Sequence, residues 1–431
     1  MRVHLQTLGC RLNEAELESW ARDFRRNGIE PTNDIGEADL VVVNTCAVTQ
    51  ESVRKSRNLV RRAHRANPQA KLVMSGCYAA LSSEAAADEL GVDLVVGNQD
   101  KDRLVEIVQR ELSLPVMPRL ATEPGELALM PRSRQRAFVK VQDGCRYRCA
   151  YCVVTLARGD ERSRPVNDVV EEIRTLVQQG VKEVVLAGVH LGGYGSDNGS
   201  SLFELVEAVL AHTSLPRLRL GSLEPWDLPA DFWSLFENSR LMPHLHLPMQ
   251  SGADSVLRRM SRRCRSDEFL RLVAQGRASV PDLQVTTDII VGFPGETEEE
   301  WQQTLDFVRQ VGFAHVHIFA FSPREGTKAA ALPDQVPRAV QRERSAQLHE
   351  QVARQRRQIL EGQRGRRHTI LVEDRFDGRG EGPAIWRGYT PSFLRVQAPG
   401  PVGLDLENRL REVEITGIDE DRLELIGVLK G

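Results

Sequence analysis

Short apolar segments alternate with helix-length amphipathic segments along most of this 431-residue chain. Strands that alternate with helices build parallel sheets covered by helices, so the pattern predicts an α/β protein. The length exceeds what one hydrophobic core usually organises and favours about three domains. Apolar residues make up 41% and charged residues 27% of the chain, which excludes collagen-like and wholly disordered proteins.

The first 115 residues are predicted to form an N-terminal parallel-sheet α/β domain. Its expected strands lie at 3–7, 40–44, 71–75 and 93–96. Cys10, Cys46 and Cys77 directly follow the first three of these strands. Because the carboxyl ends of parallel strands lie at one edge of a sheet, the three cysteines are expected to converge there.

Residues 116–136 are interpreted as a linker, and a second α/β domain is expected at 137–362. Six strands are expected in this domain, at 137–142, 183–186, 217–220, 244–247, 285–291 and 315–321. Six β/α repeats favour a (β/α)6 barrel, closed or partial, over an open two-faced sheet. The last segment, 363–431, alternates like strands and suits a small C-terminal antiparallel β-barrel.

The sequence CRYRCAYC places Cys145, Cys149 and Cys152 on a compact loop after the first strand of the central domain. Three thiolates at this spacing suit three irons of a 4Fe-4S cluster and leave the fourth iron open. Zinc is the alternative, but structural zinc takes four protein ligands, and the nearest further histidine or cysteine in the sequence is His190. Cys264 matches no ligand position and is interpreted as a bystander thiol.

The formal net charge is only -3, so an anionic partner must be held by local basic patches. No segment approaches the roughly 20 apolar residues that cross a bilayer, and the N-terminus lacks the apolar core of a signal peptide. The seven cysteines are few and odd in number, which argues against a disulfide framework. A cytoplasmic protein without a membrane partner is expected.

The CxxxCxxC motif on the first strand of a β/α barrel, with Tyr151 before its last cysteine, resembles the radical S-adenosylmethionine superfamily. Further motifs resemble the methylthiotransferase family: NTC at 44–46, SGC at 75–77, ARGDERSRP at 157–165, LEPWDL at 223–228, HLPMQSG at 246–252 and TDIIVGFPGET at 287–297. The resemblance covers essentially the whole chain. It implies an N-terminal methylthiotransferase domain, a radical core and a C-terminal TRAM domain that binds RNA.

By this resemblance the chain uses two 4Fe-4S clusters and S-adenosyl-L-methionine. Cys145, Cys149 and Cys152 hold the cluster that cleaves S-adenosylmethionine to a 5′-deoxyadenosyl radical. Cys10, Cys46 and Cys77 hold an auxiliary cluster that delivers methylated sulfur.

The resemblance also implies a set of cofactor contacts: Tyr151, Arg158, Gly188, Val189, His190, Gly292 and Pro294. Thr155 and Leu156 depart from the proline and aromatic residue that are frequent in the family.

The segment GVHLGGYG at 188–195 resembles the branch that modifies threonylcarbamoyladenosine beside the anticodon of tRNA. Isopentenyladenosine in tRNA and a ribosomal protein are alternative substrates for the same chemistry. A one-cluster radical enzyme and a non-catalytic zinc-containing RNA-binding protein are further alternatives. The expected partners are tRNA and an electron donor such as flavodoxin or ferredoxin, and the chain is expected to act as a monomer.

Two basic segments support RNA binding. Arg54, Arg57, Arg61 and Arg65 recur at helical spacing, and nine arginines against three glutamates lie between residues 338 and 368. Such faces contact phosphates in nucleic-acid-binding proteins, although each alone is more often a solvated surface. Three aromatic residues of the last domain either stack on bases or fill the barrel core: Trp386, Tyr389 and Phe393.

Overall fold

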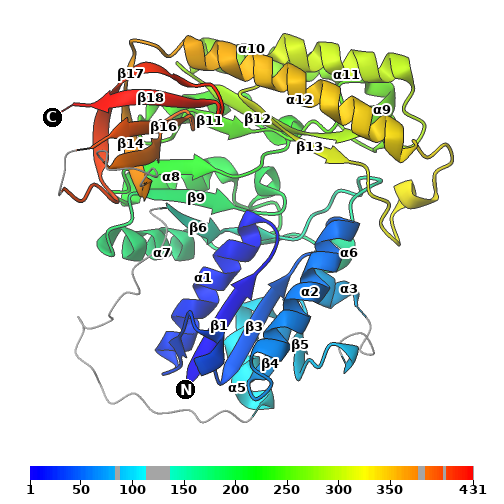
Figure 1. The fold of residues 1–431 in the computed structure, drawn as a ribbon, viewed down its shortest axis with the longest axis vertical. Coiled ribbons are helices and arrows are strands. Elements are labelled where there is room, and N and C mark those ends of the chain that lie inside the picture. The colour runs from blue at the N-terminus through cyan, green and yellow to red at the C-terminus, as the bar shows by residue number, and fades with distance from the viewer. Residues whose placement is uncertain (83–87, 113–135, 377–383, 401–403, 431) are drawn as a thin grey trace.

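The structure, a computed structural model, describes residues 1–82, 88–112, 136–376, 384–400 and 404–430. An N-terminal sheet (blue) lies below a central unit (green to gold), and the C-terminal strands (red) pack beside that unit (Figure 1). This arrangement confirms the predicted α/β class. The predicted linker at 116–136 lies outside the described residues except for Arg136. Within the described ranges, no helix is long and apolar enough to span a membrane.

The N-terminal sheet has five parallel strands in the order β2-β1-β3-β4-β5. The strands are β1 (Arg2–Thr7), β2 (Glu30–Pro31), β3 (Leu40–Thr45), β4 (Lys71–Gly76) and β5 (Leu94–Val96), and the helices are α1 (Arg11–Arg26), α2 (Gln50–Ala66), α3 (Cys77–Leu81) and α5 (Leu104–Glu111). Val42 packs with α1 and α5 on one face, whereas Val41 and Val43 pack with α2 on the other. Burial on both faces explains why β3 is a continuous apolar run.

The central unit contains the six predicted parallel strands. They are β6 (Arg136–Lys140), β9 (Glu183–Ala187), β10 (Arg217–Leu220), β11 (His244–His246), β12 (Gln284–Val291) and β13 (His315–Ala320). They form two three-stranded sheets, β10-β9-β6 and β11-β12-β13, which a parallel bridge between Ser222 and His246 links. Among the described strands, β6 pairs only with β9 and β13 only with β12, so the barrel is partial rather than closed.

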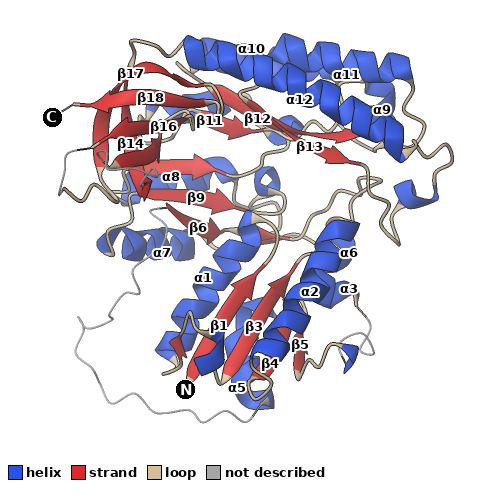
Figure 2. Cartoon of the chain, viewed as in Figure 1, coloured by secondary structure: helices blue, strands red, loops and turns tan. Residues whose placement is uncertain are grey.

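Helices cover the outer face of this partial barrel. They are α7 (Val166–Gln178), α8 (Leu202–His212), α9 (Asp254–Arg259), α10 (Ser266–Ser279), α11 (Glu298–Val311) and α12 (Arg338–Glu361). In Figure 2, α10, α11 and α12 run along β12 and β13. Thr297 caps α11 by accepting a hydrogen bond from the Glu300 amide in a capping box, which fixes the end of the TDIIVGFPGET motif.

The C-terminal strands form a closed five-stranded barrel in the order β14-β15-β16-β18-β17. Their bounds are β14 (Arg367–Phe376), β15 (Ile385–Tyr389), β16 (Arg395–Pro399), β17 (Leu410–Asp419) and β18 (Glu424–Leu429). The expectation of a fully antiparallel barrel needs one correction, because β16 and β18 pair in parallel. A closed ring with an odd number of strands cannot alternate direction throughout, so at least one pair must be parallel.

Two buried arginines of β10 hold this barrel on the central unit. Arg219 donates hydrogen bonds to the carbonyl oxygens of Pro391 (2.8 Å) and Thr390 (2.9 Å). Arg217 donates to the Tyr389 carbonyl at 3.1 Å. Burial alone would raise the pKa of Glu183 beside them, but Arg219, Arg136 and Arg217 lower it to about 2.

Candidate active site

The three cysteines of the CRYRCAYC motif lie on one turn that follows β7 (Gln142–Asp143). The Cys145 amide donates a hydrogen bond to the Gly159 carbonyl at 3.1 Å, which ties the start of the turn to the end of α6 (Val154–Arg158). Gly144, just before the turn, has a φ of +73°, and a Cβ there would lie 1.8 Å from the Asp160 carbonyl oxygen. The backbone therefore holds the three sulfur donors in a defined geometry.

The thiols of this turn lie close enough to repel one another when charged. Burial raises the pKa of Cys145 to about 12, and negative charge on Cys152 and Cys149 contributes to the rise. Burial likewise raises the pKa of Cys152 to about 11. Thiolate ligands must lose their protons to bind metal, and a cation among the three sulfurs offsets both the burial and the repulsion. The turn thus fits the cluster that the sequence predicts.

The second set of cysteines lies at the carboxyl edge of the N-terminal sheet. Cys10 follows β1, Cys46 follows β3 and Cys77 follows β4. These three strands are neighbours in the sheet, so the three cysteines converge at its edge. Burial raises the pKa of Cys46, and negative charge on Cys10 and Cys77 adds to this rise. Gly76 has a φ of +102°, and a Cβ there would lie 2.2 Å from the Thr45 carbonyl oxygen. Three thiolates at one place would carry negative charge that a metal centre can balance. This second set therefore also fits an iron–sulfur cluster.

A buried network of charges connects the two sets of cysteines. Nη1 of Arg158, at the end of α6, lies 2.9 Å from Oε1 of Glu16 and 2.8 Å from Oδ1 of Asp143. Nη2 of Arg158 donates to Oδ1 of Asn13 at 2.9 Å. Asn13 lies three residues after Cys10, and Asp143 lies two residues before the turn 145–152, which we call the radical turn after the chemistry predicted for it. One side chain of the central unit therefore spans both sites.

Lys101 completes this network from the other side of Glu16, with its Nζ 2.6 Å from Oε2. Burial alone would raise the pKa of Glu16, but Arg158, Lys101 and Lys140 hold it well below its usual range. The Arg158 side chain is only 2% exposed, so its charge is balanced inside the protein.

The resemblance implies that Arg158 contacts the cofactor, and this role stays a prediction. The structure places Arg158 at the junction between the two cysteine sets, where its terminal nitrogens bond to Glu16, Asp143 and Asn13. These three hydrogen bonds leave two of the five guanidinium donors for another partner.

The other expected cofactor contacts lie at the carboxyl ends of the barrel strands. Gly188, Val189 and His190 directly follow β9, and Gly292 and Pro294 follow β12. The radical turn follows β7 near the end of β6, so all three segments lie at the end of the barrel where parallel sheets bind ligands.

Within the radical turn, Tyr151 packs against the buried cluster that contains Phe293 and Phe321. Burial raises the pKa of Tyr151 well above its ordinary value.

The imidazole of His190 bonds to two carboxylates. Its Nδ1 contacts Glu161, and its Nε2 lies 2.6 Å from Oδ2 of Asp227. Burial lowers the pKa of His190, but the hydrogen bonds to Asp227 and Glu161 outweigh it, so the pKa is raised. The Cys145 sulfur and one ligand atom each of Glu161 and His190 lie within 4.8 Å of one another. His190 thus links two carboxylates at the edge of the radical turn, and its contact with the cofactor stays a prediction.

Four charged residues of this site were not singled out from the sequence: Glu161, Asp227, Glu224 and Arg262. Arg262 Nη2 lies 2.7 Å from Oε2 of Glu224, Nη1 lies 3.9 Å from the Cys149 sulfur, and the guanidinium lies over the Trp226 ring. Glu161 belongs to ARGDERSRP and the pair Glu224 and Asp227 to LEPWDL. The sequence signal that could have identified these residues was the presence of carboxylates within the two motifs.

Three remaining residues have simple surroundings. Cys264 is 4% exposed inside the main hydrophobic core, and burial raises its pKa to about 12, which suits an inert thiol. Thr155 and Leu156, which depart from the family pattern, lie on α6, and Leu156 is 55% exposed. Neither contributes a sulfur ligand.

Two family comparisons match different parts of the chain. Residues 2–97 match the family described as "Uncharacterized protein family UPF0004", and residues 139–308 match the Radical SAM superfamily. A radical S-adenosylmethionine methyltransferase from Kitasatospora setae, TsrM, has a similar fold, with a TM-score of 0.56 and 16% identity over 76% of this chain and 74% of that one. The central unit is therefore a radical S-adenosylmethionine domain.

Relatives with similar sequences identify the family within this superfamily. The threonylcarbamoyladenosine tRNA methylthiotransferase MtaB of Thermotoga maritima is 38% identical over 86% of each chain. Its counterpart in Bacillus subtilis is 35% identical over 92% of this chain and 90% of the relative. The tRNA-2-methylthio-N(6)-dimethylallyladenosine synthase of Oceanobacillus iheyensis is 32% identical over 96% and 81%. The chain belongs to the radical S-adenosylmethionine methylthiotransferase family and is a transferase.

Proposed function

We propose that this enzyme adds a methylthio group to carbon 2 of threonylcarbamoyladenosine beside the anticodon of tRNA. The observation that carries the proposal is the joining of two cysteine sets through Arg158, because methylthiolation needs a radical source and a sulfur source at one substrate. Relatives named for threonylcarbamoyladenosine, which are 33–38% identical to this chain, support this substrate.

In this proposal Cys145, Cys149 and Cys152 hold one 4Fe-4S cluster, and Cys10, Cys46 and Cys77 hold a second. When bound, the two clusters and S-adenosylmethionine supply a 5′-deoxyadenosyl radical and methylated sulfur, the reactivity that an inert C–H bond requires.

The chain itself supplies position and charge. The glycine-bordered radical turn fixes three sulfurs, and Arg158 fixes the N-terminal domain against it. The segments 188–190 and 292–294, together with Tyr151, hold S-adenosylmethionine at the strand ends, and His190 also orients Glu161 and Asp227. The three cysteines of the turn are partly buried, which limits the access of water to the site.

Mass spectrometry of nucleosides tests the substrate. The reconstituted protein is incubated anaerobically with S-adenosylmethionine, a reductant and tRNA bearing threonylcarbamoyladenosine, and in parallel with tRNA bearing isopentenyladenosine. We expect 2-methylthio-threonylcarbamoyladenosine from the first tRNA only, and its loss in Cys145→Ala. Methylthiolation of the second tRNA alone would assign the enzyme to the dimethylallyladenosine branch, to which relatives at 31–36% identity belong.

We further propose that a flavodoxin or ferredoxin supplies the electron and that the enzyme acts as a cytoplasmic monomer. Reduction of the reconstituted protein by purified flavodoxin or ferredoxin, followed by its absorbance, tests the first point. Light scattering of the protein with and without tRNA tests the second.

A further inference from the structure

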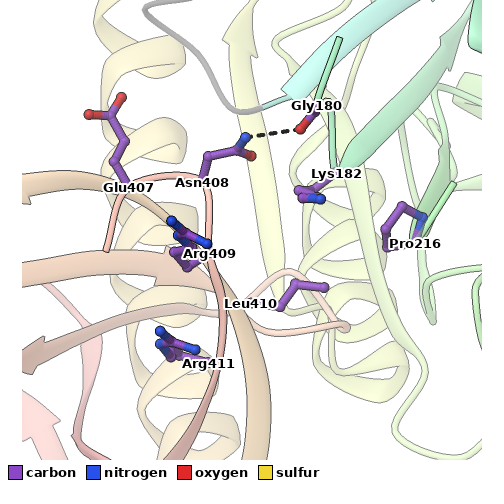
Figure 3. A pocket seen from close by; sticks show the side chains of 8 residues that line it. All are labelled: Gly180, Lys182, Pro216, Glu407, Asn408, Arg409, Leu410 and Arg411. Carbon is purple, nitrogen blue, oxygen red and sulfur yellow. Dashed lines mark hydrogen bonds between the residues drawn. The ribbon is translucent and has the colours of Figure 1, made fainter. Parts of the chain in front are cut away.

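A groove lies where the C-terminal barrel meets the amino ends of two barrel strands of the radical domain. Its volume is about 540 Å³. One wall comes from the radical domain, with Gly180, Lys182 and Pro216 beside β9 and β10. The other wall is the segment 407–411, which leads into β17 (Figure 3).

The two walls are fixed relative to each other. Nδ2 of Asn408 donates a hydrogen bond across the groove to the Gly180 carbonyl at 2.9 Å (Figure 3). The Asn408 amide donates to the Val372 carbonyl at 3.0 Å, which ties this segment to β14. Arg217 and Arg219 anchor the same barrel a short way along β10. The groove is therefore a preformed feature of the folded chain.

Three cations and one acidic residue, Glu407, line this groove. Lys182 on one wall and Arg409 and Arg411 on the other form no ion pair with any residue that the structure describes. Glu407 also lines the groove, and in Figure 3 its carboxylate extends away from Lys182. Like charges placed together repel, so an anion that enters the groove gains three attractive contacts at once.

The basic faces that the sequence highlights differ from this groove because acids neutralise part of them. On α2, Arg57 and Arg61 lie 3.5 and 3.1 Å from Oε1 of Glu89. In the segment after residue 338, Arg357 pairs with Glu420 at 2.7 Å and Arg366 with Asp282 at 2.6 Å. The groove differs from both faces because its cations come from two domains and lie on two facing walls, which makes it the better candidate for holding an anion.

The lining also indicates the class of anion. None of the eight residues is aromatic, so the groove offers no surface on which a base would stack. A liquid water molecule occupies about 30 Å³, so the groove has room for a length of backbone rather than a single ion. Cations on both walls suit a chain of negative charges that passes between them. A groove with these features suits contact with phosphates rather than with bases.

We propose that this groove binds the phosphodiester backbone of the tRNA substrate through Lys182, Arg409 and Arg411. The proposal rests on the proposed function, because it takes tRNA as the partner. The groove lies at the amino ends of β9 and β10, whereas the radical turn and segment 188–190 lie at the carboxyl ends. It therefore holds a part of the tRNA remote from the modified nucleoside, and it contributes affinity without touching the reaction.

Binding of fluorescently labelled tRNA bearing threonylcarbamoyladenosine, measured by anisotropy with the full reconstituted chain at 50–200 mM KCl, tests this groove. For K182A/R409A/R411A we expect binding about 10-fold to 100-fold weaker at the lowest salt. The slope of log K against log salt is expected to fall by about two, since each phosphate contact contributes roughly 0.7–0.9. Cleavage of S-adenosylmethionine without tRNA is expected to be unchanged.

A matched control removes three exposed arginines that already have acidic partners. R271A/R309A/R354A changes the net charge by the same amount but leaves the groove intact, since these residues pair with Asp267, Asp306 and Glu350. We expect the control to keep the wild-type slope. The charge-retaining variant K182R/R409K/R411K is expected to keep most of the affinity, which separates lost charge from altered folding.

Equal affinities and slopes for the groove variant and the control would overturn the groove as a phosphate site. Failure of the wild-type chain to bind this tRNA would instead overturn the proposed substrate, and the role of the groove with it. The two failures are distinguishable because the first requires wild-type binding.

Discussion

The two sets of cysteines are built in opposite ways. The radical set comes from one turn, residues 145–152, whereas the auxiliary set gathers from three strand ends spread over residues 10–77. The turn needs only local backbone bonds, but the strand ends need the whole parallel sheet in register. Local sequence can therefore specify the first site, while only tertiary structure assembles the second.

The two sets differ in their electrostatic surroundings as well. Lys101 and Arg158 place buried positive charge near Cys77, and Arg158 also acts on Cys10. Arg158 belongs to the radical domain, so the auxiliary set depends on its neighbour for this charge. The radical set has Arg262 beside Cys149 but also the negative charge of Glu224. The auxiliary site is thus the more dependent of the two on the packing of domains.

Replacing one cysteine from each set should separate the two sites, and it has the largest expected effect. Cys149→Ala is expected to lose S-adenosylmethionine cleavage and product completely, because the radical turn loses one of three sulfur ligands. Cys46→Ala is expected to keep cleavage and about half of the iron but to form no methylthiolated nucleoside. Iron and sulfide assays, chromatography of 5′-deoxyadenosine and nucleoside mass spectrometry measure these three properties.

Cys264→Ala is the control for this pair, because Cys264 lies in the hydrophobic core away from both sets. It is expected to keep the iron content, the cleavage and the product. Full iron and normal product in Cys46→Ala would show that the enzyme works with a single cluster.

Removing Arg158 should weaken the junction between the two sites. Arg158→Ala leaves the carboxylates of Glu16 and Asp143 buried beside one fewer cation, and breaking a buried ion pair costs about 3–5 kcal/mol. Urea unfolding of the apoprotein at pH 7 measures the free energy of unfolding. Arg162→Ala, a nearby half-exposed arginine 3.8 Å from Asp143, is the control and is expected to cost less than about 1 kcal/mol. Similar losses for both variants would contradict the network.

The glycines beside the two sets give a smaller and selective test. Gly76→Ala is expected to lower the free energy of unfolding by about 2–3 kcal/mol, because the residue has a positive φ and its new Cβ would clash with the Thr45 carbonyl. Gly144→Ala is expected to destabilise the radical turn for the same reason, because Gly144 also has a positive φ and its new Cβ would clash with the Asp160 carbonyl. Iron analysis should show that each variant loses mainly its own cluster.

Gly199→Ala provides the control for strain alone, since this glycine also has a positive φ but nothing lies within 4 Å of an added Cβ. It is expected to cost about 1 kcal/mol and to leave the iron content unchanged. Loss of both clusters in Gly76→Ala would mean that the two sites fold as one unit.

Much of the fold follows from local pattern. Four of the five strands of the N-terminal sheet and the six strands of the partial barrel could be predicted to within a few residues, because buried parallel strands are short apolar runs between amphipathic helices. The two-residue strand β2 was missed, because Glu30 and Pro31 form no apolar run. The CRYRCAYC turn was equally visible because its ligands are neighbours in sequence. The parallel pairing of β16 and β18 was not visible, because it follows from closure of the ring rather than from either strand.

The charged parts of the site were harder to predict. Glu16 and Lys101 lie 85 residues apart, and neither has a pattern that distinguishes it from a surface residue. Arg158 was singled out from the sequence, but its partners come from two domains, so the ion-pair network could be seen only once the packing was known. Trp386 fills the barrel core, and Tyr389 stacks on Phe393 at the domain junction, so neither of the two rings on that junction is a free platform for a base.

The smallest expected effect is the pH dependence that His190 gives to the free energy of unfolding. His190 lies beside the radical turn and not beside the auxiliary cysteines. Its pKa in the folded protein is raised because the protonated ring bonds to Asp227 and Glu161. The stabilisation is therefore fully present below the unfolded pKa of about 6.5 and is lost as pH rises through the higher folded pKa. The difference in unfolding free energy between wild type and His190→Gln should be largest near pH 6 and shrink toward pH 9.

Urea titrations of both proteins at pH 6, 7.5 and 9 measure this difference. His212→Gln, at the exposed end of α8, is expected to stay within about 0.5 kcal/mol of wild type at each pH. A difference that does not change with pH would mean that His190 is neutral in the folded protein and that the two carboxylates are held by other groups. His190 lies beside Cys145 rather than beside the auxiliary cysteines, so His190→Gln should leave the iron bound by Cys10, Cys46 and Cys77 equal to that of wild type at each pH.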